Sequence, residues 1–287
     1  MLTSYLTLCF KFIQKHHIPA FQAILFNYWT CVITGSFVNG GLPISSTTFY
    51  EPSFKYALLM GFMFISIFNI VGFTAQKIGV AVASVGNKLS LVIPFIFSVY
   101  LYHDQINLFK IMGIVIALLA VVLTCWPATV SSTEPAPNRI PLSLLVLVPS
   151  VLFFSSGLLD TLIKFVEHRF LNETNHNAFL IRSFAVAGTI GTLMLILFLL
   201  MGKQKFSYKA IIAGICIGVP NYFSIWCLLK VLKANEGNSS AVIPINNMGI
   251  VLFSSIMAML IFKEKLSTLN WTGILLSICA IALIAYA

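Results

Sequence analysis

A lysine within a long apolar stretch is the residue of this sequence whose chemistry is hardest to explain by packing. Lys88 lies about nine residues into the stretch from Gly79 to Tyr102, beside Asn87 and one turn after Ser84. An ammonium group surrounded by hydrocarbon costs roughly 2.5 to 3.5 kcal/mol, so it needs a partner or a wet cavity. We predict that Ser84, Asn87 and Lys88 bind an anionic group such as a carboxylate or a phosphate. The alternative is that Lys88 pairs with a neighbour on its helix or reaches interfacial water.

Two further asparagines, Asn246 and Asn247, lie in a second apolar stretch that repeats the first. A constant offset of 160 residues aligns unusual residues of the two stretches, namely Ala81 with Ala241, Asn87 with Asn247, Asp104 with Glu264 and Gly113 with Gly273. Asparagine side chains both donate and accept hydrogen bonds, which suits either binding of a solute or attachment of one helix to another. If both stretches are helical, Asn87 and Asn247 lie on stripes that we expect to face one central space.

Three more charged residues fall within or near the ends of apolar stretches. Asp160 and Lys164 are one helical turn apart, a spacing that lets them pair on one face of a helix. We expect a structural pair there, with proton coupling as the alternative. Arg182 is expected to anchor its stretch by contacting Asp160 or a lipid phosphate.

Tyr222 and Trp226 are also one turn apart and could offer an aromatic wall to a solute, the alternative being packing or interfacial anchoring. The 6 cysteines all lie inside apolar segments without the spacing of a metal or redox site. We therefore expect them to act as small core residues, and we expect no metal.

The composition indicates the environment that these residues share. Of 287 residues, 59% are hydrophobic and 9% are charged, and the mean hydropathy is +0.97. A soluble domain carries roughly a quarter charged residues, so this chain has too few polar groups to cover a soluble fold. Its net charge of +9 does not indicate nucleic acid, because the lysines and arginines are spread between apolar stretches. The chain is therefore predicted to be an integral membrane protein whose partner is the lipid bilayer.

Apolar stretches define the predicted membrane spans, because roughly 20 apolar residues cross about 30 Å of hydrocarbon as a helix. The predicted spans are residues 2–13, 20–38, 54–75, 79–102, 106–126, 141–163, 178–201, 210–232, 239–262 and 266–286. The first span is about ten residues shorter than its counterpart, the sixth, so either Met1 is not the true start or this helix crosses only part of the bilayer.

The longest polar stretch divides the chain into two halves. Residues 128–139, rich in proline, serine and threonine, are the predicted linker between a first repeat of residues 1–127 and a second of residues 140–287. An odd number of spans in each half gives the repeats opposite orientations, so the predicted fold is an all-α membrane protein of two inverted five-helix repeats. Inverted repeats are typical of secondary transporters, since the two halves can exchange conformations around a midplane site.

Two related segments carry a resemblance to a known family. They read AQKIGVAVASVGNKLSLVIPFIFSVYLYHDQI and LKANEGNSSAVIPINNMGIVLFSSIMAMLIFKEKLS, and each combines a small-residue helix, a run of aliphatic residues and an acidic residue at the helix end. The whole sequence resembles the drug/metabolite transporter superfamily, of the ten-helix EamA type. The segment from Ile181 to Phe184 resembles that family's arginine at the start of the second helix of a repeat, whereas the first half departs from it with Asn27 and Tyr28. The resemblance implies a central cavity between the halves.

The repeat and the resemblance together predict a secondary transporter, an exporter or exchanger of small metabolites such as amino acids or related solutes. The sequence contains no Gly-rich phosphate loop, HExxH, GxSxG or CxxC motif, so we expect neither an enzyme nor a cofactor. Transport would then use a proton gradient or a counter-substrate, in the inner membrane of a bacterium, with homo-oligomers left open. The alternative is an intramembrane enzyme or scaffold acting on lipid or head-group substrates. It would need His, Asp or Glu residues clustered at one membrane depth.

Overall fold

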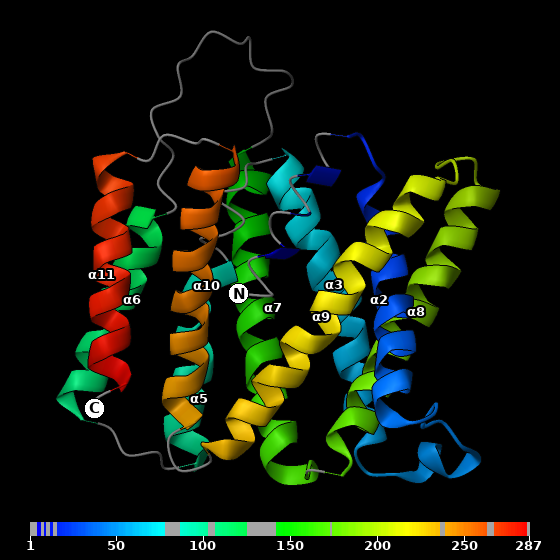
Figure 1. The fold of residues 1–287 in the computed structure, drawn as a ribbon, viewed down its shortest axis with the longest axis horizontal. Coiled ribbons are helices and arrows are strands. Elements are labelled where there is room, and N and C mark those ends of the chain that lie inside the picture. The colour runs from blue at the N-terminus through cyan, green and yellow to red at the C-terminus, as the bar shows by residue number, and fades with distance from the viewer. Residues whose placement is uncertain are drawn as a thin grey trace, which may run out of the picture. The chain divides into compact units, whose positions relative to one another are not determined.

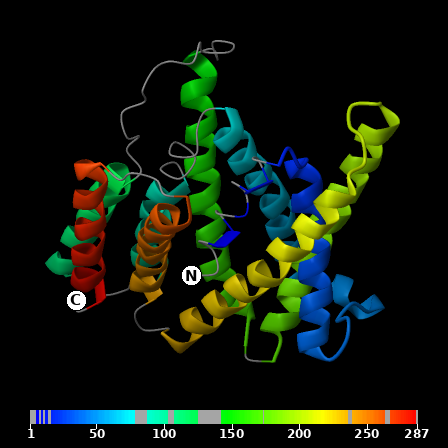
Figure 2. The ribbon, with the colours of Figure 1, turned by 45° about the horizontal axis from the view of Figure 1, so that its top comes forward.

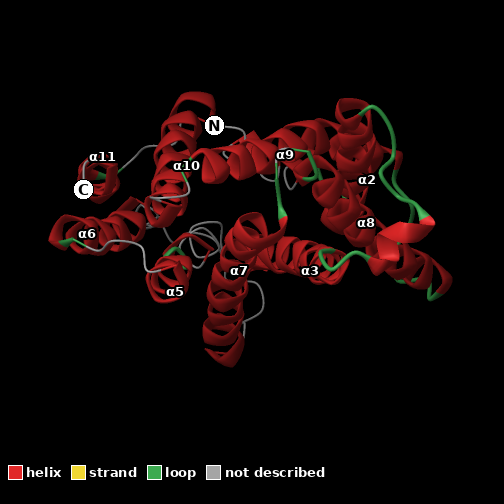
Figure 3. Ribbon diagram, turned by 90° about the horizontal axis from the view of Figure 1, so that it is seen from below, coloured by secondary structure: helices red, strands yellow, loops and turns green. Residues whose placement is uncertain are grey.

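The described part of the chain is helical in this computed structural model, and no strand occurs in it (Figure 3). The structure describes residues 5–6, 9, 12–13, 16–77, 87–102, 107–124, 142–172, 174–235, 239–262 and 267–285. Ser84, most of the first predicted span and the predicted linker lie outside these residues. The elements are α2 (Ala20–Asn39), η1 (Ser46–Tyr50), α3 (Phe54–Lys77), α5 (Val92–Tyr102), α6 (Leu108–Thr124), α7 (Leu142–Phe170), α8 (His176–Leu200), α9 (Tyr208–Ala234), α10 (Ser239–Phe262) and α11 (Thr268–Ala285).

Several of these helices have the length and the composition of membrane spans. Within the described residues, 5 segments are long and apolar enough to cross a bilayer, namely Ala20–Asn39, Phe54–Thr74, Leu147–Phe170, His176–Leu200 and Tyr208–Ala234. Shorter apolar helices occur at Asn87–Phe97, Leu108–Leu123, Ala241–Phe253 and Thr268–Ile284. The prediction of an all-α integral membrane protein is confirmed.

The helix ends keep the register of the sequence repeat. Helices α5 and α10 end at Tyr102 and Phe262, and α6 and α11 begin at Leu108 and Thr268, so each pair of positions is separated by 160 residues. These helix ends are therefore equivalent in the two repeats, whereas Asn87 precedes α5 and Asn247 lies within α10.

The chain folds as two compact units, each of which takes residues from both predicted repeats. Unit 1 comprises Phe73–Thr161 and Gly237–Ala287, and unit 2 comprises Leu2–Gly72 and Leu162–Glu236. Unit 1 therefore holds α5, α6, α10, α11 and the first part of α7, whereas unit 2 holds α2, α8, α9, most of α3 and the end of α7.

In unit 1, helices α6 and α11 lie side by side and run in opposite directions (Figure 1). The Asn270 Nδ2 near the start of α11 donates to the carbonyl of Leu123 at the end of α6, at 3.1 Å. Gly113 permits this close packing, because a Cβ there would lie 2.6 Å from Cγ1 of Ile284. Aliphatic side chains complete the core, among them Leu91, Ala117, Val121, Met248 and Val251.

In unit 2, helix α9 runs obliquely across α2 (Figure 2). Gly214 and Gly218 make the close approach possible, since a Cβ at either position would lie 2.4 Å from a side-chain atom of α2. Small residues spaced by four are a common way for membrane helices to pack backbone against backbone. The rings of Tyr28, Phe64 and Phe184 stack on one another beside this crossing, with centroids 5.4 to 6.3 Å apart.

Candidate functional site

Lys88 lies among helical residues that precede α5. Residues 87–89 are helical and are followed by a break at Ser90 and Leu91, where the hydroxyl of Ser90 donates to the carbonyl of Asn87 at 2.6 Å. The Lys88 ammonium group donates to Oδ1 of Asn247 on α10, with an Nζ to Oδ1 distance of 3.1 Å. The structure thus joins Lys88 from the first repeat to an amide from the second.

Asn247 is buried among apolar neighbours. Its side chain is only 5% exposed, and the adjacent Met248 is fully buried. The Asn247 Oδ1 accepts from Lys88, but among the described residues its Nδ2 has no hydrogen-bond partner of ordinary geometry. Asn246, which precedes it on the helix, is exposed. The two adjacent amides therefore have different surroundings, and Asn247 is the one that can meet a group inside unit 1.

Asp160 brings an opposite charge to the same cluster. Gly157 lets α7 approach α5 closely, since a Cβ on Gly157 would lie 2.5 Å from Cδ1 of Ile93. Asp160 follows Gly157 by three residues, so both lie on the same face of α7. The partly buried Asp160 interacts electrostatically with Lys88 and lies within reach of the Asn247 amide.

The charges of α7 that follow Asp160 belong to unit 2. Lys164 is 2% exposed, and its pairing with Asp160 stays a prediction. The convergence of Lys88, Asp160 and Asn247 from separate elements was not predicted as a group, although each residue was singled out.

Tyr222 and Trp226 have unlike environments in unit 2. The buried Tyr222 donates its hydroxyl to Oδ1 of Asn177 and packs against Phe184, which matches the packing alternative. Trp226 is partly buried, and the Lys230 ammonium lies 4.0 Å from its ring centroid. The Trp226 indole nitrogen is buried and has no partner among the described residues. Binding of a solute by these aromatics stays a prediction.

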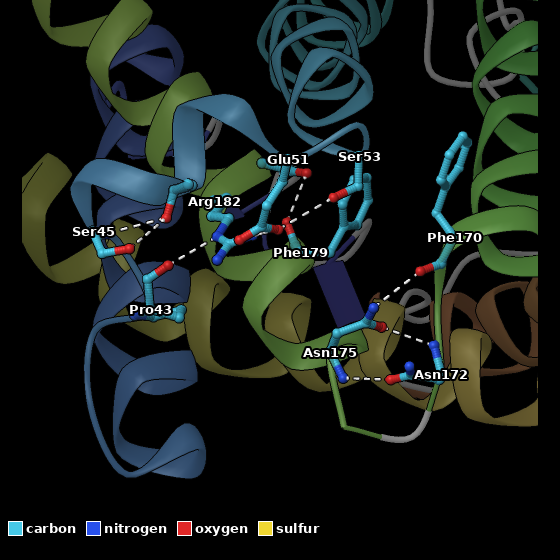
Figure 4. A network of polar contacts seen from close by, with 11 residues as sticks. Pro43, Ser45, Glu51, Ser53, Phe170, Asn172, Asn175, Phe179 and Arg182 are labelled. Atoms are coloured by element: carbon cyan, nitrogen blue, oxygen red, sulfur yellow. Dashed lines mark hydrogen bonds and ion pairs between the residues drawn. The ribbon is translucent and has the colours of Figure 1, made fainter.

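Arg182 has partners in the structure that the sequence analysis did not predict. Figure 4 shows the guanidinium pointing into the loop between α2 and α3, where it forms an ion pair with Glu51. Its Nε donates to the carbonyl of Pro43 at 2.8 Å. The loop leaves α2 at Gly40, whose φ of 77° lies in the left-handed region that glycine tolerates, and then folds through η1. This path carries Glu51 to Arg182.

Glu51 is the partner of Arg182 that sequence reasoning missed. It lies between two spans in a loop of mixed polarity, where hydropathy gives no position for it. One signal could have identified it: Glu51 is the sole acidic residue between the second and third predicted spans, and Arg182 near the start of the seventh predicted span needs an anion.

Comparison with known proteins agrees with this architecture. Residues 144–286 match the EamA-like transporter family. The match places the chain in the drug/metabolite transporter superfamily. The chain is 27% identical, over 280 residues, to a Haemophilus influenzae protein described as "Uncharacterized protein", and the similarity covers 96% of this chain and 92% of that one. The predicted family is confirmed.

A known crystal structure resembles the fold of this chain. The TM-score is 0.72 with 11% sequence identity, and the similarity covers 99% of this chain and 93% of the other. At this identity the similarity shows the fold alone. Membership of a transporter family fits the expectation that the chain is not an enzyme.

Proposed function

We propose that this protein is a secondary transporter, an exporter or exchanger of small metabolites such as amino acids or related solutes. Transport proceeds by alternating access, with the two inverted repeats exchanging conformations around a shared site. The observation that carries the proposal is the cluster of Lys88, Asn247 and Asp160 within the apolar unit 1. Membership of the EamA-like family supports it.

The physical argument starts from the cost of this cluster. Charged residues within membrane helices are expensive and are retained where they line a pathway or bind a solute. A buried amide donor without a partner costs about 1 to 3 kcal/mol, and Asn247 Nδ2, which reaches Asp160 without a hydrogen bond of ordinary geometry, bears part of that cost. An incoming solute with an anionic group would accept hydrogen bonds from Lys88 Nζ and Asn247 Nδ2, which would offset both costs.

The remaining predicted residues have secondary roles in the proposal. We keep Asn87 and Ser84 as further predicted contacts of the anionic group, and contact of a solute with Tyr222 and Trp226 as a separate prediction. The driving force is a proton gradient or a counter-substrate. We place the protein in the inner membrane of a bacterium and leave open its association with further copies of itself.

Transport by the full-length protein in liposomes tests the proposal. Vesicles are loaded in turn with a panel of labelled amino acids, nucleosides, sugar phosphates and carboxylates, and efflux is followed with and without a pH gradient. We expect at least one solute to leave faster than from protein-free vesicles, with acceleration by the same solute outside. If no solute in the panel moves faster than in protein-free vesicles, the proposal is wrong. A thermal-shift screen of the same metabolites selects candidates, since a ligand raises the stability of the state that binds it.

A further inference from the structure

The cluster in unit 1 holds a positive group, a negative group and an amide donor. The positive group is the ammonium of Lys88, which donates to Asn247 Oδ1 at 3.1 Å. The negative group is the carboxylate of Asp160, which interacts electrostatically with that ammonium. The donor is Nδ2 of the 95% buried Asn247, which lies within reach of Asp160 but makes no hydrogen bond of ordinary geometry among the described residues. These groups come from the helical residues before α5, from α7 and from α10, so the tertiary fold assembles them.

We propose that Asp160 is the resident counter-ion of Lys88 and selects solutes that carry a positive group beside their anionic group. The proposal rests on the proposed transport function and adds to it a residue that sets specificity. In the empty site Asp160 balances Lys88. When a zwitterionic solute binds, its carboxylate takes the place of Asp160 beside Lys88, and its ammonium donates to Asp160.

Charge and hydrogen-bond complementarity explain the selection. The solute carboxylate accepts from Lys88 Nζ and also from Asn247 Nδ2, the donor that otherwise makes no hydrogen bond of ordinary geometry among the described residues. The solute ammonium then provides the cation that Asp160 has lost, so the net charge of the site does not change. A solute with a carboxylate but no ammonium would place two anions beside one cation in a medium of low dielectric constant, which is unfavourable.

A purely structural ion pair would have different surroundings. Buried ion pairs hold together when further hydrogen bonds satisfy their remaining donors and acceptors. Here the amide beside the pair reaches Asp160 without a hydrogen bond of ordinary geometry, so its donor is poorly satisfied. Unit 2 also contains a buried amide donor without a described partner, Asn27 Nδ2, but its hydrogen-bonding neighbours are the uncharged Asn221 and Cys31. Only the unit 1 cluster therefore combines a poorly satisfied donor with two opposite charges among these described contacts.

Matched ligand pairs test this role directly. Binding to the purified full-length protein in detergent is measured for a panel of L-amino acids and for the 2-hydroxy acids with the same side chains. Each pair shares its carboxylate and its shape and differs in the ammonium group. We expect the amino acid of the best-binding pair to bind at least tenfold more tightly. Equal binding of the two classes, or tighter binding of the hydroxy acids, overturns the proposal.

Variants assign the preference to Asp160. In Asp160→Asn we expect the amino acid to lose at least tenfold in affinity while the hydroxy acid binds as before or more tightly, so the preference disappears. Asp160→Glu keeps the negative charge and should retain the preference. Glu51→Gln, which removes an acid in unit 2, should not change it. An unchanged preference in Asp160→Asn overturns the proposal, and if that variant does not fold, the wild-type ligand pairs still decide.

The outcomes separate this proposal from the proposed function. If neither ligand class binds but the liposomes release another metabolite, the role of Asp160 is wrong and the transport function stands. If no solute in the transport panel moves, the transport function itself is wrong.

Discussion

The two compact units use polar residues in different ways. Unit 2 buries Lys164 and Glu167 three residues apart on one helix, a spacing that allows local pairing, and it holds Arg182 against Glu51 where helix meets loop. Unit 1 instead gathers Lys88, Asp160 and Asn247 from three separate elements.

The packing around these groups differs as well. Unit 2 is held by stacked aromatic rings and by the glycine-mediated crossing of α2 and α9. The core of unit 1 is mainly aliphatic. Charged residues within membrane helices are costly and are retained where they serve a function, and we propose that those of unit 1 bind a solute. Variants in both units can break or sharpen this contrast.

Removal of the unit 1 cation should have the largest effect. We expect Lys88→Ala to lower transport at least about 30-fold, because truncation of one partner of a buried, hydrogen-bonded charge pair costs roughly 2 to 5 kcal/mol. Expression and the helical circular dichroism spectrum should remain normal. Lys209→Ala, at an exposed lysine of unit 2, is the matched control and should transport normally. Equal transport by Lys88→Ala and wild type would remove the distinction between the units.

The next largest effect is expected at the helix crossing of unit 2, on stability. A Cβ on Gly218 would lie 2.4 Å from Cβ of Thr30 and 2.7 Å from the carbonyl of Asn27. Gly218→Val should therefore lower the free energy of unfolding by about 3 kcal/mol, the upper part of the usual cost of overpacking. Titration with denaturing detergent, followed by circular dichroism, measures this.

Gly249 of α10 supplies the control for that variant. A Cβ there would meet no atom within 4 Å, so Gly249→Ala should leave stability unchanged or raise it slightly. Equal stability of the two glycine variants would contradict the crossing as the main support of unit 2.

The loop contact of Arg182 should give an intermediate effect. Arg182→Gln loses the ion pair with Glu51 and weakens the contact with Pro43, and we expect a loss of about 2 kcal/mol, typical of hydrogen bonds to charged groups. Glu51→Gln should cost less, because the Glu51 side chain is 41% exposed, against 12% for Arg182. Thermal unfolding in detergent measures the stability of both variants. A larger loss of stability for Glu51→Gln than for Arg182→Gln would contradict the view that the less exposed partner contributes more.

The smallest effect is expected for the amide pair of unit 2. Asn221 Nδ2 donates to Asn27 Oδ1 at 3.1 Å, and such contacts between membrane helices are worth about 0.6 kcal/mol on average. A double-mutant cycle with Asn27→Ala and Asn221→Ala should return a coupling energy of this size. A coupling of several kcal/mol would mean that unit 2, too, depends on a polar core.

Hydropathy predicted the ends of a helix correctly where the polar residues of the sequence begin at the same position as the helix end. Helices α2 and α10 begin at the predicted residues, and α10 also ends where expected. Helix α7 continues from the predicted end at Ile163 to Phe170, through Lys164, Glu167 and Arg169. Charged residues with long side chains are good helix formers, so the apolar stretch ends before the helix does.

The site was only partly predictable for a related reason. The energetic cost of Lys88 and the repeat offset singled out Lys88 and Asn247 from sequence alone. Asp160 was assigned to its helix neighbour Lys164, because spacing along one helix is visible in a sequence. Its interaction with Lys88 depends on the close packing of Gly157 against Ile93, which is a property of the tertiary fold.

The interleaving of the two units has a consequence for biogenesis. Synthesis runs from the N-terminus, so all of unit 2 has been made once the chain reaches Glu236, whereas unit 1 still lacks α10 and α11. Lys88 enters the bilayer 159 residues before Asn247 is made. Asp160, its counter-ion, is made before Asn247, so the charge of Lys88 can be balanced first, whereas its hydrogen bond to the Asn247 amide forms only after α10 has been inserted.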